Sequence, residues 1–427
     1  MTSPALRALL DEPLGTRHKA FPPALAAVRV ADVGARGLNV ARGDLLLPAL
    51  TLREDAVAHN VATMASWCEE RGVSLAPHGK TTMAPQLFHR QMAAGAWGMT
   101  AATAGQAAIM HEHGIRRVVI ANEVVDRAGL QTVCALLAAD RTFELTCLVD
   151  SVEGVRRMEE ALAPNPPAPQ LAVLLELGSP GRRAGVRTEA DAELVAAAVG
   201  DCRHLRLVGV ECFEGVAPDR EPPAIDEVDR LLRRMGDVAR RLDAAGRFAR
   251  ADEILLSAGG SVFFDHAAEL RTIDGLSRPT RVLLRSGCYV THDSGTYDEQ
   301  SPLGSVMSGD GPRLRAALEL WSVVLSRPEP NLAILGFGRR DAPFDAGLPR
   351  LLRAGPVGSA LRPIDSAEVY ELNDQHARVR LPAEAQLAVG DHVVCGISHP
   401  CTAFDKWSLL PVVTADGDVV DAVRTLF

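Results

Sequence analysis

The sequence lacks several features that would assign the chain to a membrane or to a nucleic acid. No apolar run approaches the roughly 18 residues of a membrane-spanning helix, and residues 1–15 show no basic head followed by a continuous apolar stretch. No block of Lys and Arg is longer than a helix face, and the formal net charge is -9. We therefore expect a cytoplasmic protein that binds neither membranes nor nucleic acids.

Paired cysteine motifs and internal repeats are also missing. The eight cysteines are scattered without a CxxC spacing, which in a long intracellular chain indicates mostly reduced thiols. Apolar material, by contrast, is plentiful. Of the 427 residues 47% are hydrophobic and 23% charged, which is enough for a sizeable core and for roughly two or three domains.

From about residue 46, short β-rich runs alternate with longer segments of helical period, which is typical of βα units around a parallel sheet. The runs predicted to be strands are LLLPALTLR, VSLAPHG, WGMTAAT, RRVVIANEVV, FELTCLVDS, QLAVLLELG, LRLVGVECFEG and EILLSAGGS. Eight units over about 250 residues match the size of a (β/α)8 barrel. An open, doubly wound sheet of eight strands is the alternative.

The pattern changes after residue 305, where β-rich, partly alternating runs with Gly and Asp turns predict a mostly β domain. We therefore predict an α/β protein with two domains. The barrel covers residues 47–305, and the β domain is formed by residues 1–46 together with 306–427. Residues 38–47 could add a strand to this β domain and so pair the two ends of the chain.

Polar residues follow several of the predicted strands, and active sites of such barrels lie at the C-terminal ends of the strands. His78 and Lys80 follow the second predicted strand, in the stretch LAPHGKTTMAPQ. The other residues at this rim are Thr103, Arg183, Glu214 and the run Ser257–Ser261. Glu214 is equally compatible with a place near a cofactor and with a pairing to a neighbouring residue.

Gly259 and Gly260 follow the last predicted strand. Glycines let backbone N–H groups approach an anion closely, and phosphate sites in barrels favour the loops after strands seven and eight. A tight βα turn is the simpler explanation of two glycines alone. Combined with a lysine at the same rim, however, a phosphate site indicates pyridoxal 5'-phosphate, whose aldehyde bonds to a lysine.

His399 and Cys401 form a second chemical feature, in the motif SHPC. In an extended chain, residues two apart point to the same face, and imidazole plus thiolate is a zinc-type ligand pair. Pro400 between them suits an edge or the end of a strand. A hydrogen-bonded histidine beside a buried thiol is the alternative. Two protein ligands would leave positions for water and substrate, as in a catalytic metal site.

Seven separated motifs, in chain order, resemble the D-serine dehydratase and D-threonine aldolase group of pyridoxal-phosphate enzymes. They are LAPHGKTTMAPQ, WGMTAATAGQA, ELGSPGRRAGVR, LLSAGGS, LLRSGCYVTHD, GFGRRDAPFDAGLP and GISHPCTAFDKW, between about Leu47 and Trp407. HPC and FDAGLP are most similar to the D-serine deaminase, or amino-acid deaminase, branch. The resemblance implies an alanine-racemase-like barrel of PLP fold type III, a C-terminal mostly β domain and a homodimer.

The resemblance also implies roles for particular residues. Lys80 would bond to pyridoxal 5'-phosphate and later act as the base at Cα. The remaining cofactor contacts would come from His78, Arg183, Gly259, Gly260, Ser261 and Tyr289. His399 and Cys401 would hold a divalent metal, Zn2+. One motif departs from the group, because Gly178, Ser179 and Pro180 stand where relatives often carry an aspartate.

The implied reaction is that of a PLP-dependent lyase that converts a small D-hydroxy amino acid, of the D-serine or D-threonine type, into a 2-oxo acid and ammonia. The metal would help the β-hydroxyl to leave. If the metal instead deprotonated that hydroxyl, the Cα–Cβ bond would break as in an aldolase. The thiolate of Cys401 favours the dehydratase, because aldolase relatives tend to carry aspartate at this position. A racemase with Tyr370 as second base and a non-catalytic cofactor-binding protein are further alternatives.

Overall fold

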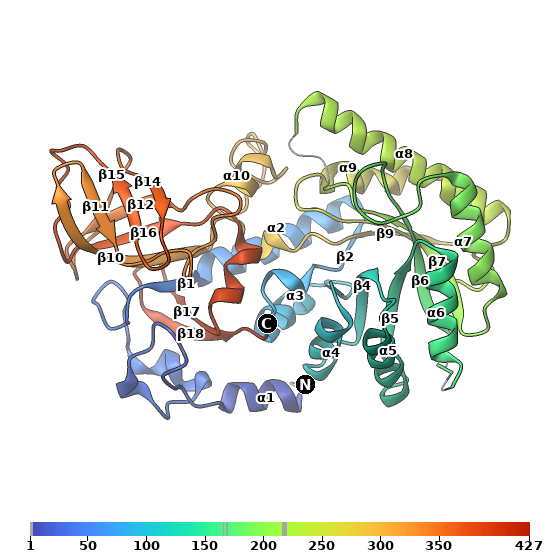
Figure 1. Ribbon diagram of the computed structural model, residues 1–427, viewed down its shortest axis with the longest axis horizontal. Helices are drawn as coiled ribbons and strands as arrows, with labels where there is room; N and C mark the ends of the chain where they lie inside the picture. Colours follow the sequence, from blue (N-terminus) through green and yellow to red (C-terminus); the bar gives the residue numbers. More distant parts are fainter. Residues whose placement is uncertain (1–2, 165, 168–169, 216–219) are drawn as a thin grey trace. The chain divides into compact units, whose positions relative to one another are not determined.

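The computed structural model describes residues 3–164, 166–167, 170–215 and 220–427 (Figure 1). The chain divides into two compact units. The barrel unit contains Met64–Lys80 and Phe88–Gly287, and the β unit contains Met1–Thr63, Thr81–Leu87 and Cys288–Phe427. Each unit is built around a sheet of its own.

The barrel unit contains one sheet of eight strands, within the described residues, whose neighbours are all parallel. Its order is β2-β9-β8-β7-β6-β5-β4-β3. A parallel bridge between His78 and Thr100 joins the chain beyond β2 to β3 and so closes the sheet. The (β/α)8 barrel predicted from the sequence is therefore confirmed. The strands are β2 (Ser74–Leu75), β3 (Met99–Ala101), β4 (Arg117–Glu123), β5 (Glu144–Val149), β6 (Leu171–Leu177), β7 (Leu205–Cys212), β8 (Ile254–Ala258) and β9 (Thr280–Leu284).

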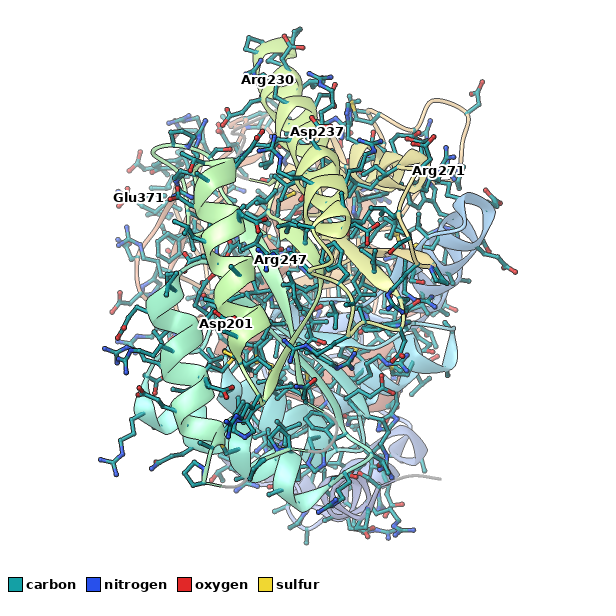
Figure 2. The ribbon with its side chains drawn as sticks, turned by 90° about the vertical axis from the view of Figure 1, so that its right-hand side faces the viewer. Asp201, Arg230, Asp237, Arg247, Arg271 and Glu371 are labelled. Carbon is teal, nitrogen blue, oxygen red and sulfur yellow. The ribbon has the colours of Figure 1, made fainter. Side chains whose placement is uncertain are left out.

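Helices follow most of these strands and form an outer layer (Figure 1). They are α3 (Pro85–Ala93), α4 (Ala104–Glu112), α5 (Arg127–Ala139), α6 (Val152–Leu162), α7 (Glu189–Asp201), α8 (Pro222–Ala244), α9 (Phe264–Ala268) and the 3-10 helix η4 (Glu269–Thr272). Polar side chains cap α4, α5, α6 and α7 by accepting a backbone N–H of the first turn. Figure 2 looks onto this layer, where the exposed side chains of Arg230 and Asp237 project outward from α8.

One strand assignment made from the sequence is wrong. The run LLLPALTLR, taken as the first barrel strand, forms β1 (Ala49–Arg53), which pairs with β10 and β17 in the β unit. The eighth barrel strand is instead β9, a run that the sequence pattern missed. A five-residue strand followed by the short 3-10 helix η5 (Cys288–Val290) lacks the long helical segment that marks a βα unit.

The β unit is built on a second sheet of ten strands, again within the described residues. Its main path is β13-β12-β16-β10-β1-β17-β18, and β11, β15 and β14 branch from β10. The strands, besides β1, are β10 (Leu318–Glu329), β11 (Leu332–Leu335), β12 (Arg350–Gly355), β13 (Arg362–Pro363), β14 (Glu368–Leu372), β15 (Ala377–Arg380), β16 (His392–Gly396), β17 (Leu409–Val413) and β18 (Val419–Arg424). The predicted mostly β C-terminal domain is confirmed.

The remaining described helices are the 18-residue helix α2 (Glu54–Arg71), the shorter helices α1 (Pro4–Asp11) and α10 (Thr296–Gln300), and the 3-10 helices η1 (Pro23–Leu25), η2 (Val30–Arg36), η3 (Gly79–Thr81), η6 (Pro400–Thr402) and η7 (Phe404–Lys406). The strand expected over residues 38–47 does not form. Asn39 makes a single bridge to Asp418, and a turn from Val40 to Gly43, where φ is +83°, ends the extended chain. No described helix is long and apolar enough to cross a membrane.

Candidate active site

Buried polar side chains gather at the C-terminal ends of four neighbouring barrel strands. Glu176 of β6 is in register with Glu211 of β7, and Glu211 is in register with Ser257 of β8. Because in-register residues of parallel strands point to the same face, these three side chains lie side by side. Arg285, the residue after β9, completes the group. The end of the barrel that carries active sites in this fold is therefore lined by ionisable groups.

Arg285 is the cation at the centre of this group, and only 4% of it is exposed. Its guanidinium forms an ion pair with Glu211, with Nη2 and Oε2 2.6 Å apart. It also donates hydrogen bonds to Ser257 Oγ at 2.5 Å and to the carbonyl oxygen of Cys212 at 3.1 Å. These contacts fix the plane of the guanidinium inside the barrel.

The carboxyl groups around Arg285 outnumber its single positive charge. Burial raises the pKa of Glu176 to about 10, helped by a hydrogen bond to Glu123 and by the charge of Glu211. Burial also raises the pKa of Glu211 to about 7, although the neighbouring Arg285 acts in the opposite direction. The carboxyl group of Glu176 therefore keeps its proton at neutral pH.

Lys80 lies in η3, directly after β2, as the sequence predicts. The His78 N–H donates to the carbonyl oxygen of Arg285 at 3.1 Å, so the Lys80 segment is tied to the Arg285 segment. Burial and the charges of Lys80 and Arg285 lower the pKa of His78 well below its ordinary value, so its ring is neutral. The Nδ1 atom of His78 is buried without a hydrogen-bond partner in the described chain. This ring is the kind of group that a bound cofactor would satisfy.

Gly259 and Gly260 form the turn after β8, and both N–H groups bind a carboxylate. Gly259 donates to Glu214 Oε2 at 2.9 Å, and Gly260 donates to Glu214 Oε1 at 2.7 Å. Ser286 Oγ donates to the Gly260 carbonyl oxygen at 2.6 Å. The turn is thus an anion-binding turn whose two N–H donors hold the carboxylate of Glu214, so the pairing of Glu214 with neighbouring residues is observed. Ser261 follows the turn and is half-buried.

The remaining candidate residues have different surroundings. The guanidinium of Arg183 is exposed and lies over the ring of Phe213, 4.8 Å from its centroid. Thr103 caps α4 by accepting the Gln106 N–H at 3.2 Å, which is a structural role. Tyr289 is buried within η5 of the β unit.

His399 contacts Asp345 in the β unit, and neither His399 nor Cys401 lies on a strand. His399 is extended and Cys401 is in the 3-10 turn η6, so the alternation of an extended chain, used to pair them from the sequence, is wrong. His399 Nδ1 lies 2.6 Å from Asp345 Oδ2, and Thr402 Oγ1 donates to Asp345 Oδ1 at 2.7 Å. The carboxylate therefore fixes which nitrogen of His399 carries the proton.

Cys401 contacts a second thiol. Its Sγ lies 3.3 Å from Cys288 Sγ and 3.3 Å from Thr81 Oγ1. Tyr297 hydrogen-bonds to Cys288. The ring of Tyr297 is edge-on to the ring of His399, with the two ring centroids 6.2 Å apart. The charge that Cys288 can carry, together with burial, raises the pKa of the Tyr297 hydroxyl well above its ordinary value. In the part of the chain that is described, no three His, Cys, Asp or Glu side chains are arranged to hold a metal ion together.

Tyr370, the candidate second base of a racemase, lies elsewhere in the β unit. It belongs to β14, and the guanidinium groups of Arg378 and Arg380 lie 5.7 and 4.8 Å from its ring centroid. These contacts give its ring a packing role.

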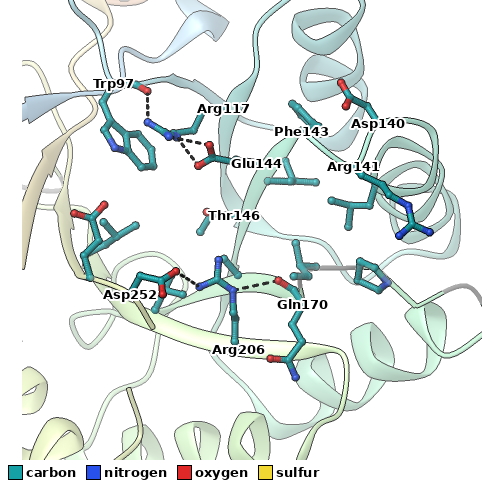
Figure 3. A pocket seen from close by; sticks show the side chains of 18 residues that line it. Trp97, Arg117, Asp140, Arg141, Phe143, Glu144, Thr146, Gln170, Arg206 and Asp252 are labelled. Carbon is teal, nitrogen blue, oxygen red and sulfur yellow. Dashed lines mark hydrogen bonds and ion pairs between the residues drawn. The ribbon is translucent and has the colours of Figure 1, made fainter. Parts of the chain in front are cut away.

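A cavity of about 180 Å3 opens at the opposite end of the barrel (Figure 3). It is lined by residues at the N-terminal ends of β4 and β5, among them Arg117 and Glu144, and by Arg206 near the start of β7. Arg117 is bound to Glu144 by two hydrogen bonds and lies over Trp97, 4.4 Å from the ring centroid. Residues at this end of a barrel serve stability, so the cavity is not the candidate active site.

Several residues of the barrel group around Arg285 and of the β-unit group around His399 were not identified from the sequence, although they lie in motifs that drew attention. Arg285 and Cys288 belong to LLRSGCYVTHD, Glu176 to ELGSPGRRAGVR, and Asp345 to GFGRRDAPFDAGLP. Glu211 carried a weaker signal, namely a carboxylate near the end of a mostly apolar strand. A buried charge in such a run is a recognisable mark of a site.

The closed parallel barrel, the mostly β unit and the lysine after β2 define an alanine-racemase-like enzyme. Residues 52–272 match the family model described as "Alanine racemase, N-terminal domain", and this match covers just over half of the 427 residues. The chain belongs to that family. Residues 317–413 match a second model, described as "Putative serine dehydratase domain". The group to which the motifs were assigned from the sequence is thereby confirmed.

Individual relatives support the same assignment. D-threonine aldolase of Arthrobacter sp is 26% identical over 378 residues, which are 88% of this chain and 90% of that protein. D-threo-3-hydroxyaspartate dehydratase of Delftia sp. (strain HT23) is 29% identical over 204 residues, 47% of this chain and 52% of that protein. Among solved structures, D-threonine aldolase from Filomicrobium marinum is 27% identical with a TM-score of 0.74, covering 91% of this chain and 97% of that chain. Aldolases and dehydratases of this kind are lyases, and the chain is an enzyme of the lyase type.

Proposed function

We propose that the protein is a pyridoxal-phosphate- and metal-dependent dehydratase of small D-hydroxy amino acids, of the D-serine or D-threonine type, that releases a 2-oxo acid and ammonia. The observation that carries the proposal is the pairing of His399 with Asp345, with Cys401 two residues further on. A histidine oriented by a carboxylate, with a cysteine two residues further on in the sequence, supplies the residue types of a zinc-type ligand pair, which a racemase of this fold does not need.

The residues present fit pyridoxal phosphate. Lys80 supplies the amine, and the buried Nδ1 of His78, which has no partner in the described chain, needs a polar group nearby. A Cβ at Gly259 would lie 2.5 Å from Arg285 Cβ, so only a glycine lets the backbone of this turn approach the Arg285 side chain so closely. Arg285, fixed by Glu211, offers a cation to the ring, and Ser261, Arg183 and Tyr289 remain candidates for cofactor contacts. Gly259 and Gly260 would act by holding the turn through Glu214.

When bound, pyridoxal phosphate would supply an electron sink for the substrate's Cα carbanion, and the metal a Lewis acid for its β-oxygen. Lys80 would remove the Cα proton as the general base. The neutral ring of His78 avoids adding a second positive charge beside the amine, and Glu214 keeps the turn after β8 rigid. The protonated carboxyl group of Glu176 hydrogen-bonds to Glu123 inside the barrel.

His399 and Cys401 would hold the metal, with zinc favoured by the thiolate. Asp345 accepts at Nδ1 of His399, which leaves Nε2 with the lone pair that a metal needs. Within the β unit, Thr81 Oγ1 contacts the sulfur of Cys401.

An aldolase is the second candidate, and a specific observation favours it. The D-threonine aldolase of Arthrobacter sp matches 88% of this chain, whereas the dehydratase of Delftia sp. (strain HT23) matches 47%. The same residues would then hold the cofactor and the metal, and the Cα–Cβ bond of the substrate would break after its β-hydroxyl had lost a proton. The thiol at Cys401 is the reason to place the dehydratase first.

Incubation of the purified protein with D-threonine, with and without a chelator, separates the two reactions. Ammonia with 2-oxobutyrate, lost on chelation and restored by zinc, supports the dehydratase. Glycine with acetaldehyde identifies the aldolase. Lys80→Ala should abolish either reaction, and Cys401→Ala should abolish the metal-dependent turnover while the cofactor stays bound. If the native protein forms neither product, both candidates fail.

The proposal also includes a homodimer that is located in the cytoplasm. Its binding partner besides a second copy of the chain would be the D-amino acid substrate, and it would bind neither nucleic acids nor membranes. Its support is the resemblance of the motifs and the net charge of -9. Light scattering of the purified protein measures the oligomeric state, and a molar mass of one chain would contradict the homodimer.

A further inference from the structure

The two closest thiols of the β unit belong to Cys288 and Cys401, whose Sγ atoms lie 3.3 Å apart. They are 113 residues apart in the chain. Cys288 begins the one-turn helix η5, and Cys401 lies in the one-turn helix η6. A disulfide has an S–S length of about 2.05 Å, so each sulfur would move by well under 1 Å.

The two thiols differ in access. Cys288 is 4% exposed, whereas Cys401 is half-buried. Tyr297 hydrogen-bonds to Cys288, and Thr81 hydrogen-bonds to Cys401. Each sulfur therefore has a polar neighbour that can stabilise a thiolate. An oxidant arriving from solvent would therefore meet Cys401 first, and Cys288 would be in place to react with the product.

We propose that Cys288 and Cys401 form a reversible disulfide when the protein meets a hydroperoxide, and that this bond removes Cys401 from the metal site. The thiolate of Cys401 attacks a peroxide oxygen, so that an S–O bond forms, the O–O bond breaks and water leaves. The thiolate of Cys288 then attacks that sulfur, an S–S bond forms, and the hydroxyl leaves as a second water. Two thiols lose two protons and two electrons, and hydrogen peroxide is reduced to two waters.

The consequence for the metal rests on the proposed function, because it assumes that Cys401 is a metal ligand. A sulfur in a disulfide is no longer a thiolate and cannot serve as that ligand. A bound metal conversely holds the Cys401 thiolate and keeps it from the peroxide. Metal binding and oxidation therefore compete for one sulfur, and a reductant reverses the loss.

The test compares the full-length protein with zinc and after removal of zinc by a chelator. Each sample is treated with hydrogen peroxide, its remaining thiols are alkylated, and it is digested without reductant for mass spectrometry. We expect a peptide pair linked through Cys288 and Cys401 that forms faster without zinc and disappears with dithiothreitol. In the zinc-loaded sample, zinc content should fall as the linked peptide accumulates and recover after reduction and added zinc.

Cys288→Ser is the matched variant, and Cys134→Ser, which changes a half-buried thiol on α5, is its control. The Cys288→Ser variant should form no linked peptide and should keep its zinc. Because Cys401 then has no thiol to react with, its oxidation should proceed to a sulfinic acid. Cys134→Ser should behave as the native protein. Oxidation of Cys401 in the native protein without the linked peptide overturns the proposal, and this result needs no variant.

Two further outcomes separate the disulfide from the metal. If the linked peptide forms but zinc content does not change, the disulfide stands and the metal role of Cys401 fails. If zinc is absent from the freshly purified protein and added zinc does not bind, the proposed metal site fails, whereas the linked peptide is still expected.

Discussion

Asp345 and His399 are 54 residues apart in the chain, and their side chains meet with Oδ2 and Nδ1 separated by 2.6 Å. Burial alone would raise the pKa of Asp345, but the hydrogen bonds from Thr402 and His399 hold it below its ordinary value. The carboxylate therefore stays charged and keeps a proton on Nδ1 of the imidazole. Nε2 is left as the nitrogen available to a metal.

Asp345→Asn should weaken zinc binding by about 10- to 100-fold, because a neutral amide orients His399 less firmly and lowers the basicity of its ring. A competition titration with a chromophoric zinc chelator measures the affinity. Asp405→Asn is the control, since Asp405 is an exposed carboxylate on η7. Equal zinc affinity in the native protein and Asp345→Asn would contradict the orienting role.

Arg285→Met should destabilise the barrel unit by about 3–5 kcal/mol, the usual cost of leaving a buried charge without its partner. Glu211 is 1% exposed and would lose its ion pair. Urea unfolding measures the effect. Arg271→Met breaks an exposed pair with Glu269 and should cost no more than about 1 kcal/mol. The double variant Arg285→Met, Glu211→Gln should recover part of the loss, and a double variant as unstable as Arg285→Met would refute the pairing.

The pKa of Glu176 predicts that the protein is less stable at alkaline pH. Its folded pKa is about 10 and its ordinary value 4.5, so the folded chain holds a proton that the unfolded chain releases. This contribution is fully present below about pH 4.5 and is lost as pH rises through 10, at up to about 1.4 kcal/mol per pH unit. The free energy of unfolding should therefore decline between pH 6 and 9.

Glu176→Gln should flatten that decline, because an amide can replace the protonated carboxyl and does not titrate. Glu211→Gln provides a comparison with a different window, since the pKa of Glu211 is raised only to about 7. The titration of Glu211 should therefore stop changing the free energy of unfolding above about pH 7 to 8. Unfolding curves at pH 6, 7, 8 and 9 measure both variants. A decline above pH 8 that is as steep in Glu176→Gln as in the native protein would refute the raised pKa of Glu176.

Local patterns were sufficient to predict the elements of the barrel, but not all of their partners. Helical period and β-rich runs identified seven of the eight barrel strands, together with Lys80 after β2 and Glu214 after β7. LLLPALTLR has the same local pattern as a barrel strand, and only the pairing of β1 with β10 and β17 assigns it to the β unit. Pairing between distant segments is not encoded in a local window.

The site was predictable to a similar extent. Lys80, His399 and Cys401 carry chemistry in their residue type, so their motifs drew attention. Arg285 and Glu211 look ordinary in sequence, and their importance appears only when β7 and β9 place the two charges 2.6 Å apart in a buried position. Cys288 and Asp345 likewise acquire significance from side chains 113 and 54 residues away.

Gly259→Ala tests the turn after β8, because the added Cβ would lie 2.5 Å from Arg285 Cβ in a buried place. The turn cannot easily move away, since the Gly259 N–H holds Glu214 at 2.9 Å. We expect a loss of about 1–3 kcal/mol in stability, as for other overpacked cores, and weaker binding of pyridoxal phosphate.

Gly260→Ala should have a smaller effect, since its Cβ would meet Glu214 Oε1 at 3.0 Å and that carboxylate can shift slightly. Gly105→Ala is the control, because a Cβ at this exposed helical position would have its nearest neighbour at 3.8 Å. It should stabilise α4 by up to about 1 kcal/mol. Thermal unfolding and a titration with the cofactor, followed by absorbance, rank the three variants. If Gly259→Ala binds the cofactor as tightly as Gly105→Ala does, the turn lies outside the cofactor site and Lys80 must be assigned other partners.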